Sequence, residues 1–225
     1  ESGTPFWVAP GTATWNTILG RNRNAAANVV DAAVVGARHG AEGYLLTDWG
    51  DNGHWQPLAV SLPSMVRAAV AAWSGGTADV EVGPVIDRLL DAAPGTGALI
   101  DRLGELGESL GATTPNASPI FTALVDTGIP DLGPADPDRV AVARAVVAEA
   151  ATTFGDQPFG GGRGEILAAE LVAACGLAQL GLRRLGGDDP DQRDLDAALG
   201  AQRDAWLGSS RPGGLDDSLA RLRLR

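Results

Sequence analysis

The sequence predicts an α/β region followed by an all-helical region. Residues 1 to about 76 alternate between short apolar runs and helical patterns, in the order strand, loop, helix, strand, loop, helix. This alternation is typical of parallel β/α units. From about residue 77 onward, helical segments follow one another between Gly- and Pro-rich turns, and no strand is needed. Five of the six tryptophans lie in the first third of the chain, which supports two domains, at residues 1–76 and 77–225.

Each element of the first region follows from a local pattern. Residues 6–9 and 41–46 are short apolar runs that predict strands, and residues 24–38 carry apolar side chains at helical spacing. A second helix is expected over residues 63–73, ahead of two glycines. Two parallel strands leave open edges and cannot close a barrel alone. The other strands of a barrel would have to come from upstream sequence or from another chain, and a first residue other than methionine suggests a piece of a longer protein.

The helical region has clear helix starts and core stripes. Asp136 and Asp189 each place a capping side chain directly before a proline suited to the first helical position. Residues 164–185 and 191–206 carry apolar side chains along one side, as expected for helices that face a core. For residues 211–219 we expect a helix cap and a final amphipathic turn, rather than a segment that folds back toward the first region.

The composition argues against several classes of function. The net charge is −11, and all 17 basic residues are arginines, so nucleic acid and anionic membranes are not expected partners. No apolar run reaches about 18 residues, which predicts no membrane span. Cys175 is the single cysteine and lies in an apolar run, where we expect a buried, inert thiol. With 44% hydrophobic residues, the 225-residue chain can bury a core.

A polar, aromatic-rich loop follows the second predicted strand. Residues 47–56 contain two carboxylates, two tryptophans, a histidine and two amides, and residues 10–17 end the first strand in a similar way. Aromatic rings that cover the apolar face of a sugar, beside carboxylates and amides for its hydroxyls, are typical of a carbohydrate site. Arg21, Arg23 and Asn24 either bind ligand hydroxyls as well or pair with the nearby acids. The candidate substrate-binding residues are Trp15, Asn16, Asp48, Trp49, Asp51 and His54.

The residues of this loop also fit two other interpretations. Asp48, Asp51 and His54 recur at intervals of three, as metal ligands could. A calcium loop needs more oxygen donors and a closing glutamate, and catalytic zinc normally needs three well-placed protein ligands, so we predict no metal site. Alternatively, Trp49 and Trp55 pack in the core while the acids are solvated. Tryptophans in a Gly-rich polar loop fit that alternative poorly.

Three stretches resemble a known enzyme family. Residues 6–16, the turn at 20–24 and residues 40–54 are similar to the last part of a bacterial glycoside hydrolase family 20 catalytic domain. That family contains β-N-acetylhexosaminidases, and the match covers about residues 5–73. The resemblance implies a (β/α)8 barrel in which the two predicted strands are the seventh and eighth. It therefore implies the last two β/α units of an incomplete barrel, followed by a helical C-terminal domain.

The resemblance also implies roles for individual residues. Family members carry an aromatic-Thr-Glu-aromatic stretch at the end of the eighth strand, where this chain has residues 46–49. Asp48 would bind the outer hydroxyls of the terminal sugar. Leu46 departs from the stacking tryptophan, which leaves Trp49 or Trp15 as the wall of the sugar site.

The family's reaction is substrate-assisted. The N-acetyl carbonyl of the substrate attacks the anomeric carbon, while an adjacent Asp–Glu pair orients the acetamide and protonates the leaving oxygen, with no cofactor. This sequence contains no Asp-Glu dipeptide, so the catalytic pair is missing from the chain. We expect part of a hydrolase that cleaves terminal β-linked N-acetylhexosamine residues and is inactive as this fragment alone. The alternative is a non-catalytic carbohydrate-binding or helical interaction module.

Overall fold

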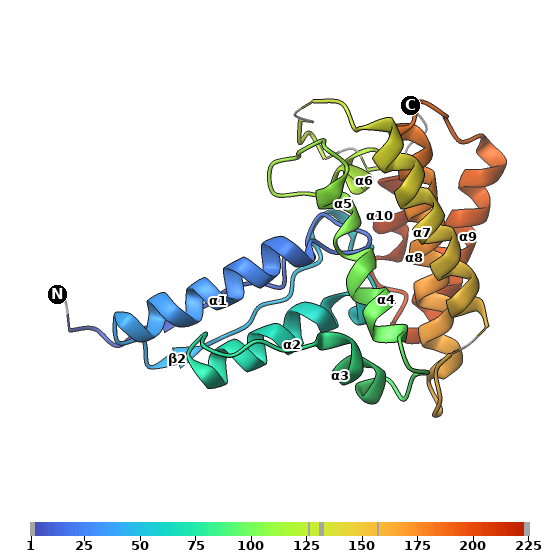
Figure 1. Ribbon diagram of the computed structural model, residues 1–225. Helices are drawn as coiled ribbons and strands as arrows, with labels where there is room; N and C mark the ends of the chain where they lie inside the picture. Colours follow the sequence, from blue (N-terminus) through green and yellow to red (C-terminus); the bar gives the residue numbers. More distant parts are fainter. Residues whose placement is uncertain (1–2, 126, 131–132, 157, 223–225) are drawn as a thin grey trace.

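A computed structural model describes residues 3–125, 127–130, 133–156 and 158–222. Two long helices, α1 and α2, extend to one side of a bundle formed by the later helices (Figure 1). The elements, in chain order, are β1 (Trp7–Val8), α1 (Asn22–Arg38), β2 (Gly43–Tyr44), η1 (Asp51–Gly53), α2 (Leu58–Ser74), α3 (Val82–Leu89), α4 (Thr96–Leu103), α5 (Leu106–Ser109), α6 (Pro119–Thr122), α7 (Pro137–Gly155), α8 (Gly164–Leu185), α9 (Gln192–Ser209) and α10 (Leu215–Ala220).

The predicted fold class is wrong for this structure. The strands β1 and β2 do pair in parallel, but each has two residues, and helices hold 58% of the residues against 5% for strands. In the described part of the chain, one further parallel bridge, between Gly11 and Thr47, continues the pairing. Beyond it the first segment bends through Ala13 and Asn16, which have φ of +57° and +54°. Because left-handed backbone cannot continue a strand, the sheet ends there. The molecule is mainly helical, with no barrel portion among the described residues.

The helix α1 begins two residues before the predicted start because a distant side chain caps it. The backbone N–H groups of Arg23 and Asn24 each donate to a carboxylate oxygen of Glu108, at 2.9 Å. These are N–H groups of the first helical turn, which have no partner inside the helix. No local pattern could reveal a cap that lies more than 80 residues away.

The helix α2 begins at Leu58, five residues before the predicted start, and Pro63 lies inside it. Asp101 of α4 ties α2 to α1. It accepts two hydrogen bonds from the Arg67 guanidinium of α2, at 2.9 and 2.8 Å, and one from Asn22 Nδ2 of α1, at 2.9 Å. The hydrogen bond to Asp101 raises the pKa of Arg67, while burial opposes this. Three helices therefore meet at one carboxylate.

The helical region agrees well with its predicted boundaries. The helix α8 spans residues 164–185, as expected, and Asp136 caps α7 by accepting from the backbone N–H of Asp138 and Arg139. The predicted start after Asp189 is wrong by two residues, because Asp191 caps α9 instead. Cys175 is buried in α8, and burial raises the pKa of its thiol to about 12, which fits the expected inert thiol.

The helix α8 is the centre of the core. It packs against α6, α7 and α9, and Leu171, Leu177 and Leu182 are fully buried along it. By length and composition alone it could cross a membrane, contrary to the expectation that no segment is long and apolar enough. A buried core helix passes the same test, and 56% of its apolar window is buried inside the protein.

Candidate functional site

Asp48 joins the two strand ends to α2. One carboxylate oxygen, Oδ1, accepts hydrogen bonds from the hydroxyls of Thr12 at 2.5 Å, Thr14 at 2.6 Å and Ser61 at 3.0 Å. These three residues are fully buried, whereas Asp48 is exposed. Its other oxygen, Oδ2, accepts only from Ser61 Oγ, at 3.2 Å, among the described residues. One oxygen therefore fixes the strand ends, and the second keeps acceptor capacity for a ligand.

Trp15 is held in one orientation by its neighbours. Its indole Nε1 donates to Asn116 Oδ1 at 2.6 Å, and the Arg21 guanidinium lies 5.0 Å from the ring centre. Such a contact is attractive because the ring face carries partial negative charge. Arg21 is itself buried, and its Nε donates to the carbonyl of Ala13 at 3.2 Å. Burial lowers the pKa of Arg21. The ring of Trp15 thus sits on a rigid support.

Asn16 links three loops rather than facing a ligand. Its side chain is buried, its Oδ1 accepts from Asn52 Nδ2 at 2.8 Å, and its Nδ2 donates to the carbonyl of Asn116 at 3.3 Å. All three asparagines have left-handed backbone, with φ of +54°, +54° and +55°. Strained positions of this kind persist only where the surroundings hold them, and they are concentrated at functional sites.

The C-terminal segment forms the expected final helical turn as α10, but it also folds back onto the loop at residues 51–54, which corrects the expectation that it would not. Ser218 Oγ in α10 donates to the carbonyl of Gly53 at 2.6 Å, and Arg221 Nη1 donates to Asn52 Oδ1 at 3.3 Å. The indole of Trp55 donates to the carbonyl of Asn52 at 2.9 Å. A segment that lies 165 residues further along the chain therefore holds this loop in place.

A cavity of about 620 Å³, here called the strand-end cavity, opens where β1 and β2 end. This volume lies within the range of small-molecule pockets, roughly 300–1,000 Å³. Trp15 and Trp49 supply aromatic rings to its wall, and Trp49 is 58% exposed. A Cβ at Gly11 would lie 2.5 Å from the Trp15 ring, so this position requires glycine. The lining residues are Val8, Ala9, Pro10, Gly11, Trp15, Asn28, Asp31, Ala32, Thr47, Trp49, Asp51 and Asn116.

The structure divides the predicted site residues into three groups. Trp15, Trp49 and Asp51 line the strand-end cavity together. Asp48 and Asn16 hold its surroundings by the hydrogen bonds described above. His54 lies elsewhere, in a second cavity. The alternative interpretation, in which the two tryptophans of the loop pack in the core, is correct for Trp55, which is 2% exposed, but not for Trp49.

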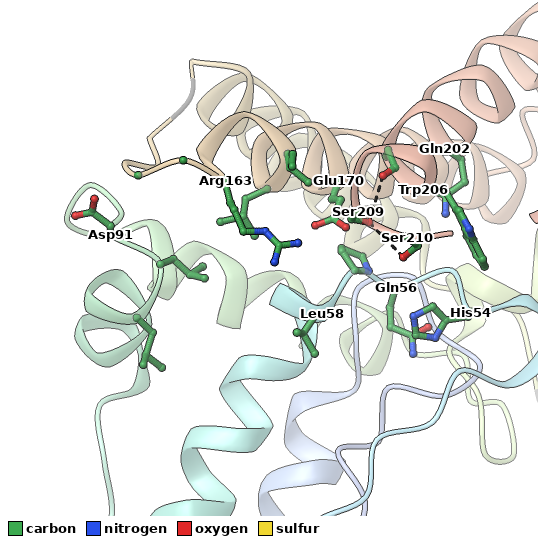
Figure 2. A pocket seen from close by; sticks show the side chains of 18 of the residues that line it. His54, Gln56, Leu58, Asp91, Arg163, Glu170, Gln202, Trp206, Ser209 and Ser210 are labelled. Atoms are coloured by element: carbon green, nitrogen blue, oxygen red, sulfur yellow. Dashed lines mark hydrogen bonds between the residues drawn. The ribbon is translucent and has the colours of Figure 1, made fainter. Parts of the chain in front are cut away.

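The second cavity, here called the α8–α9 groove, has a volume of about 540 Å³. His54–Leu58, the end of α3, the glycine-rich loop before α8, and the helices α8 and α9 form its walls (Figure 2). The ring of His54 meets the ring of Trp206 edge-on, with centres 6.3 Å apart. The same loop, residues 49–56, thus contributes to both cavities.

The two arginines have structural partners. Arg23 pairs with Glu105 at 3.1 Å, and Arg21 supports Trp15 as described. Among the described residues, neither pairs with Asp48 or Asp51. No group of three His, Cys, Asp or Glu side chains in the described residues is arranged to hold a metal ion.

Sequence reasoning missed three polar residues of the strand-end cavity. Asn28 and Asp31 come from the exposed face of α1, one turn apart, and Asn116 comes from the loop before α6. The helical spacing of Asn28 and Asp31 was visible, but it predicts only a solvated face. Asn116 lies in a segment with no periodic pattern, about 100 residues from Trp15. Only the tertiary fold brings these groups together.

The comparisons with known proteins give no family. No model of a protein family matches the chain, and no curated protein matches it.

Proposed function

We propose that this chain binds carbohydrate in the strand-end cavity, as part of a glycoside hydrolase that removes terminal β-linked N-acetylhexosamine residues. The observation that carries the proposal is that Trp15 and Trp49 line the same open cavity as Asp51 and Asn116. An indole ring offers a rigid apolar surface to the carbon face of a sugar ring. Carboxylate and amide groups accept from and donate to sugar hydroxyls.

The resemblance of residues 5–73 to glycoside hydrolase family 20 supports the choice of sugar and reaction. In that reaction the substrate's own acetamide is the nucleophile, and an adjacent Asp–Glu pair orients it and protonates the leaving oxygen. This sequence has no such dipeptide. The proposal therefore assigns substrate binding to this chain and the proton transfer to residues outside this sequence.

Calorimetric titration of the 225-residue chain with methyl N-acetyl-β-glucosaminide tests the binding step. We expect saturable binding that Trp49→Ala weakens at least tenfold, because that indole is exposed to the cavity. Trp73→Ala is the matched control, since Trp73 is 95% exposed and lies outside both cavities. Equal affinity in the two variants, or no binding at all, would refute sugar binding in the strand-end cavity.

The hydrolytic part of the proposal has a separate test. An aryl N-acetyl-β-glucosaminide should be cleaved by the natural polypeptide that contains this sequence and not by the 225-residue chain. Cleavage by the isolated chain would show that the catalytic groups are present in it. Sugar binding without hydrolysis in either form would instead support the alternative, a non-catalytic carbohydrate-binding module.

A further inference from the structure

We infer that the α8–α9 groove is a second saccharide-binding site, which takes further units of a neutral N-acetylated glycan. This inference rests on the proposed function, because it extends the same ligand class from the strand-end cavity to a groove that shares its loop. The groove has the volume of a ligand pocket and carries polar groups that are open to a ligand.

The amide of Gln202 in α9 lines the groove and is open to a ligand. Gln202 is only 7% exposed, yet its side chain makes no hydrogen bond with any of the residues that the structure describes. Its amide nitrogen and oxygen are not among the atoms that the protein encloses completely without a partner, so a ligand in the groove can reach them. In Figure 2 this side chain lies at one end of the groove beside Trp206. A ligand in the groove can satisfy both its N–H donors and its carbonyl acceptor.

Two charged groups of opposite sign lie along the same wall. Arg163 is the N-cap residue directly before α8, and Glu170 lies in the second turn of that helix; both line the groove. Neither forms an ion pair or a side-chain hydrogen bond within the described part of the chain. Asp91 also lines the groove at the end near Arg163.

This pattern of charges selects the ligand class. An anion would be attracted by Arg163 but repelled by Glu170 and Asp91. A cation would be attracted by the two carboxylates but repelled by Arg163. A neutral ligand with many hydroxyl and amide groups can donate to the carboxylates and accept from the guanidinium without either penalty. The rings of Trp206 and His54 add surfaces for its apolar faces. A glycan of N-acetylated sugars has these properties.

The loop at residues 49–56 connects the two sites. Trp49 and Asp51 line the strand-end cavity, whereas His54 and Gln56 line the groove. Gln56 Nε2 donates to the carbonyl of Trp49 at 2.9 Å, so the two parts of the loop are held together. A glycan with its terminal sugar in the strand-end cavity would therefore have a second binding surface to which the same loop contributes.

The test compares the monosaccharide methyl N-acetyl-β-glucosaminide with the β-linked N-acetylglucosamine trimer, by calorimetry on the full 225-residue chain. We expect the trimer to bind at least tenfold more tightly. Gln202→Leu and Glu170→Gln should each remove at least fivefold of that gain and leave monosaccharide affinity unchanged. Gln192→Leu in α9 and Glu165→Gln in α8 are matched controls outside the groove, and neither should change the trimer affinity.

The outcomes separate this inference from the proposed function. Equal affinities for trimer and monosaccharide, or unchanged trimer affinity in both groove variants, would overturn the inference and leave the strand-end proposal standing. Trimer binding that depends on Gln202, without any monosaccharide binding, would support the groove and refute the strand-end site. Preferential binding of glucuronic acid that Arg163→Gln abolishes would also overturn the inference, because the groove would then be an anion site. Thermal melts of each variant confirm that the fold is intact.

Discussion

The first region and the helical region bury their apolar side chains to different degrees. Residues 3–76 expose Phe6, Trp7, Leu45, Trp49, Leu58 and Trp73 by 41% or more. The helical region instead closes around α8, where whole rows of leucine and alanine are buried. Apolar burial is the main source of folding free energy. We therefore expect the helical region to supply most of the stability, while the first region presents exposed aromatic surface.

Truncating a core aromatic residue should have the largest effect in this comparison. Phe154 in α7 is fully buried and stacks on Phe159, with ring centres 6.1 Å apart. Phe154→Ala should lower the free energy of unfolding by about 3–5 kcal/mol, because it removes apolar contacts and leaves a cavity. Trp73→Ala in the first region should change it by less than about 0.5 kcal/mol. Urea denaturation measures both, and equal losses would show that the two regions contribute alike.

The second-largest loss of unfolding free energy is expected at the junction between the two regions. Asp101→Ala removes the carboxylate that Arg67 and Asn22 share in a half-buried setting, and leaves Asn22 only its hydrogen bond to the backbone carbonyl of residue 101. We expect a loss of roughly 1–3 kcal/mol in urea denaturation, since partners of a removed charge lose their hydrogen bonds. Arg102→Ala is the control, because its ion pair with Glu149 is exposed and long, at 3.9 Å. A loss no larger than that of the control would mean that Asp101 does not couple α1 and α2 to α4.

The same comparison shows what the sequence could predict. Helix positions in the helical region follow from apolar spacing and from caps such as Asp136, because those signals are local. The parallel pairing of β1 with β2 was also predictable from two apolar runs separated by a helix. The fold class was not predictable in this way, because the strand pairing ends after a few residues, where Ala13 and Asn16 adopt left-handed backbone.

The candidate site, like the fold, was predictable only where the signal is local in the sequence. Trp15, Trp49 and Asp51 were found because their residue types are unusual in neighbouring loops. The residues that hold these loops in place could not be predicted. Asn116 and Ser218 lie about 100 and 165 residues from their hydrogen-bond partners, Trp15 and Gly53. His54 was assigned to the same site because it is near in sequence, but its backbone is left-handed, with φ of +55°. That turn directs it to the α8–α9 groove.

A smaller effect is expected where α10 holds the loop of the first region. Ser218→Ala removes the donor to the carbonyl of Gly53, a partly buried contact of 2.6 Å, and should cost about 1 kcal/mol. Amide hydrogen exchange should accelerate in residues 51–56, since local opening becomes easier. Ser210→Ala, at an exposed serine of the neighbouring segment, should leave exchange there unchanged. Unchanged exchange in Ser218→Ala would show that the loop keeps its conformation without α10.

The smallest effect concerns an exposed charge cluster within the helical region. Arg183 donates hydrogen bonds to Asp188 and Asp194, which lower the pKa of both carboxyls below their ordinary value of 3.8. A lowered folded-state pKa stabilises the protein above the ordinary value, and that stabilisation is lost as pH falls through the folded-state value. The free energy of unfolding should therefore fall more steeply in the native chain than in Arg183→Gln as the pH drops below about 4.

Urea denaturation at a series of pH values, from neutral to acid, measures this difference. The cluster is exposed, so high salt should shrink the gap between the two curves by screening the charges. Parallel curves at low salt would contradict the prediction. A gap that persists at high salt would show that hydrogen-bond geometry, rather than charge, holds the turn between α8 and α9. In either case the effect should stay well below that of Phe154→Ala, because the stability of the helical region comes from its buried core rather than from its surface charges.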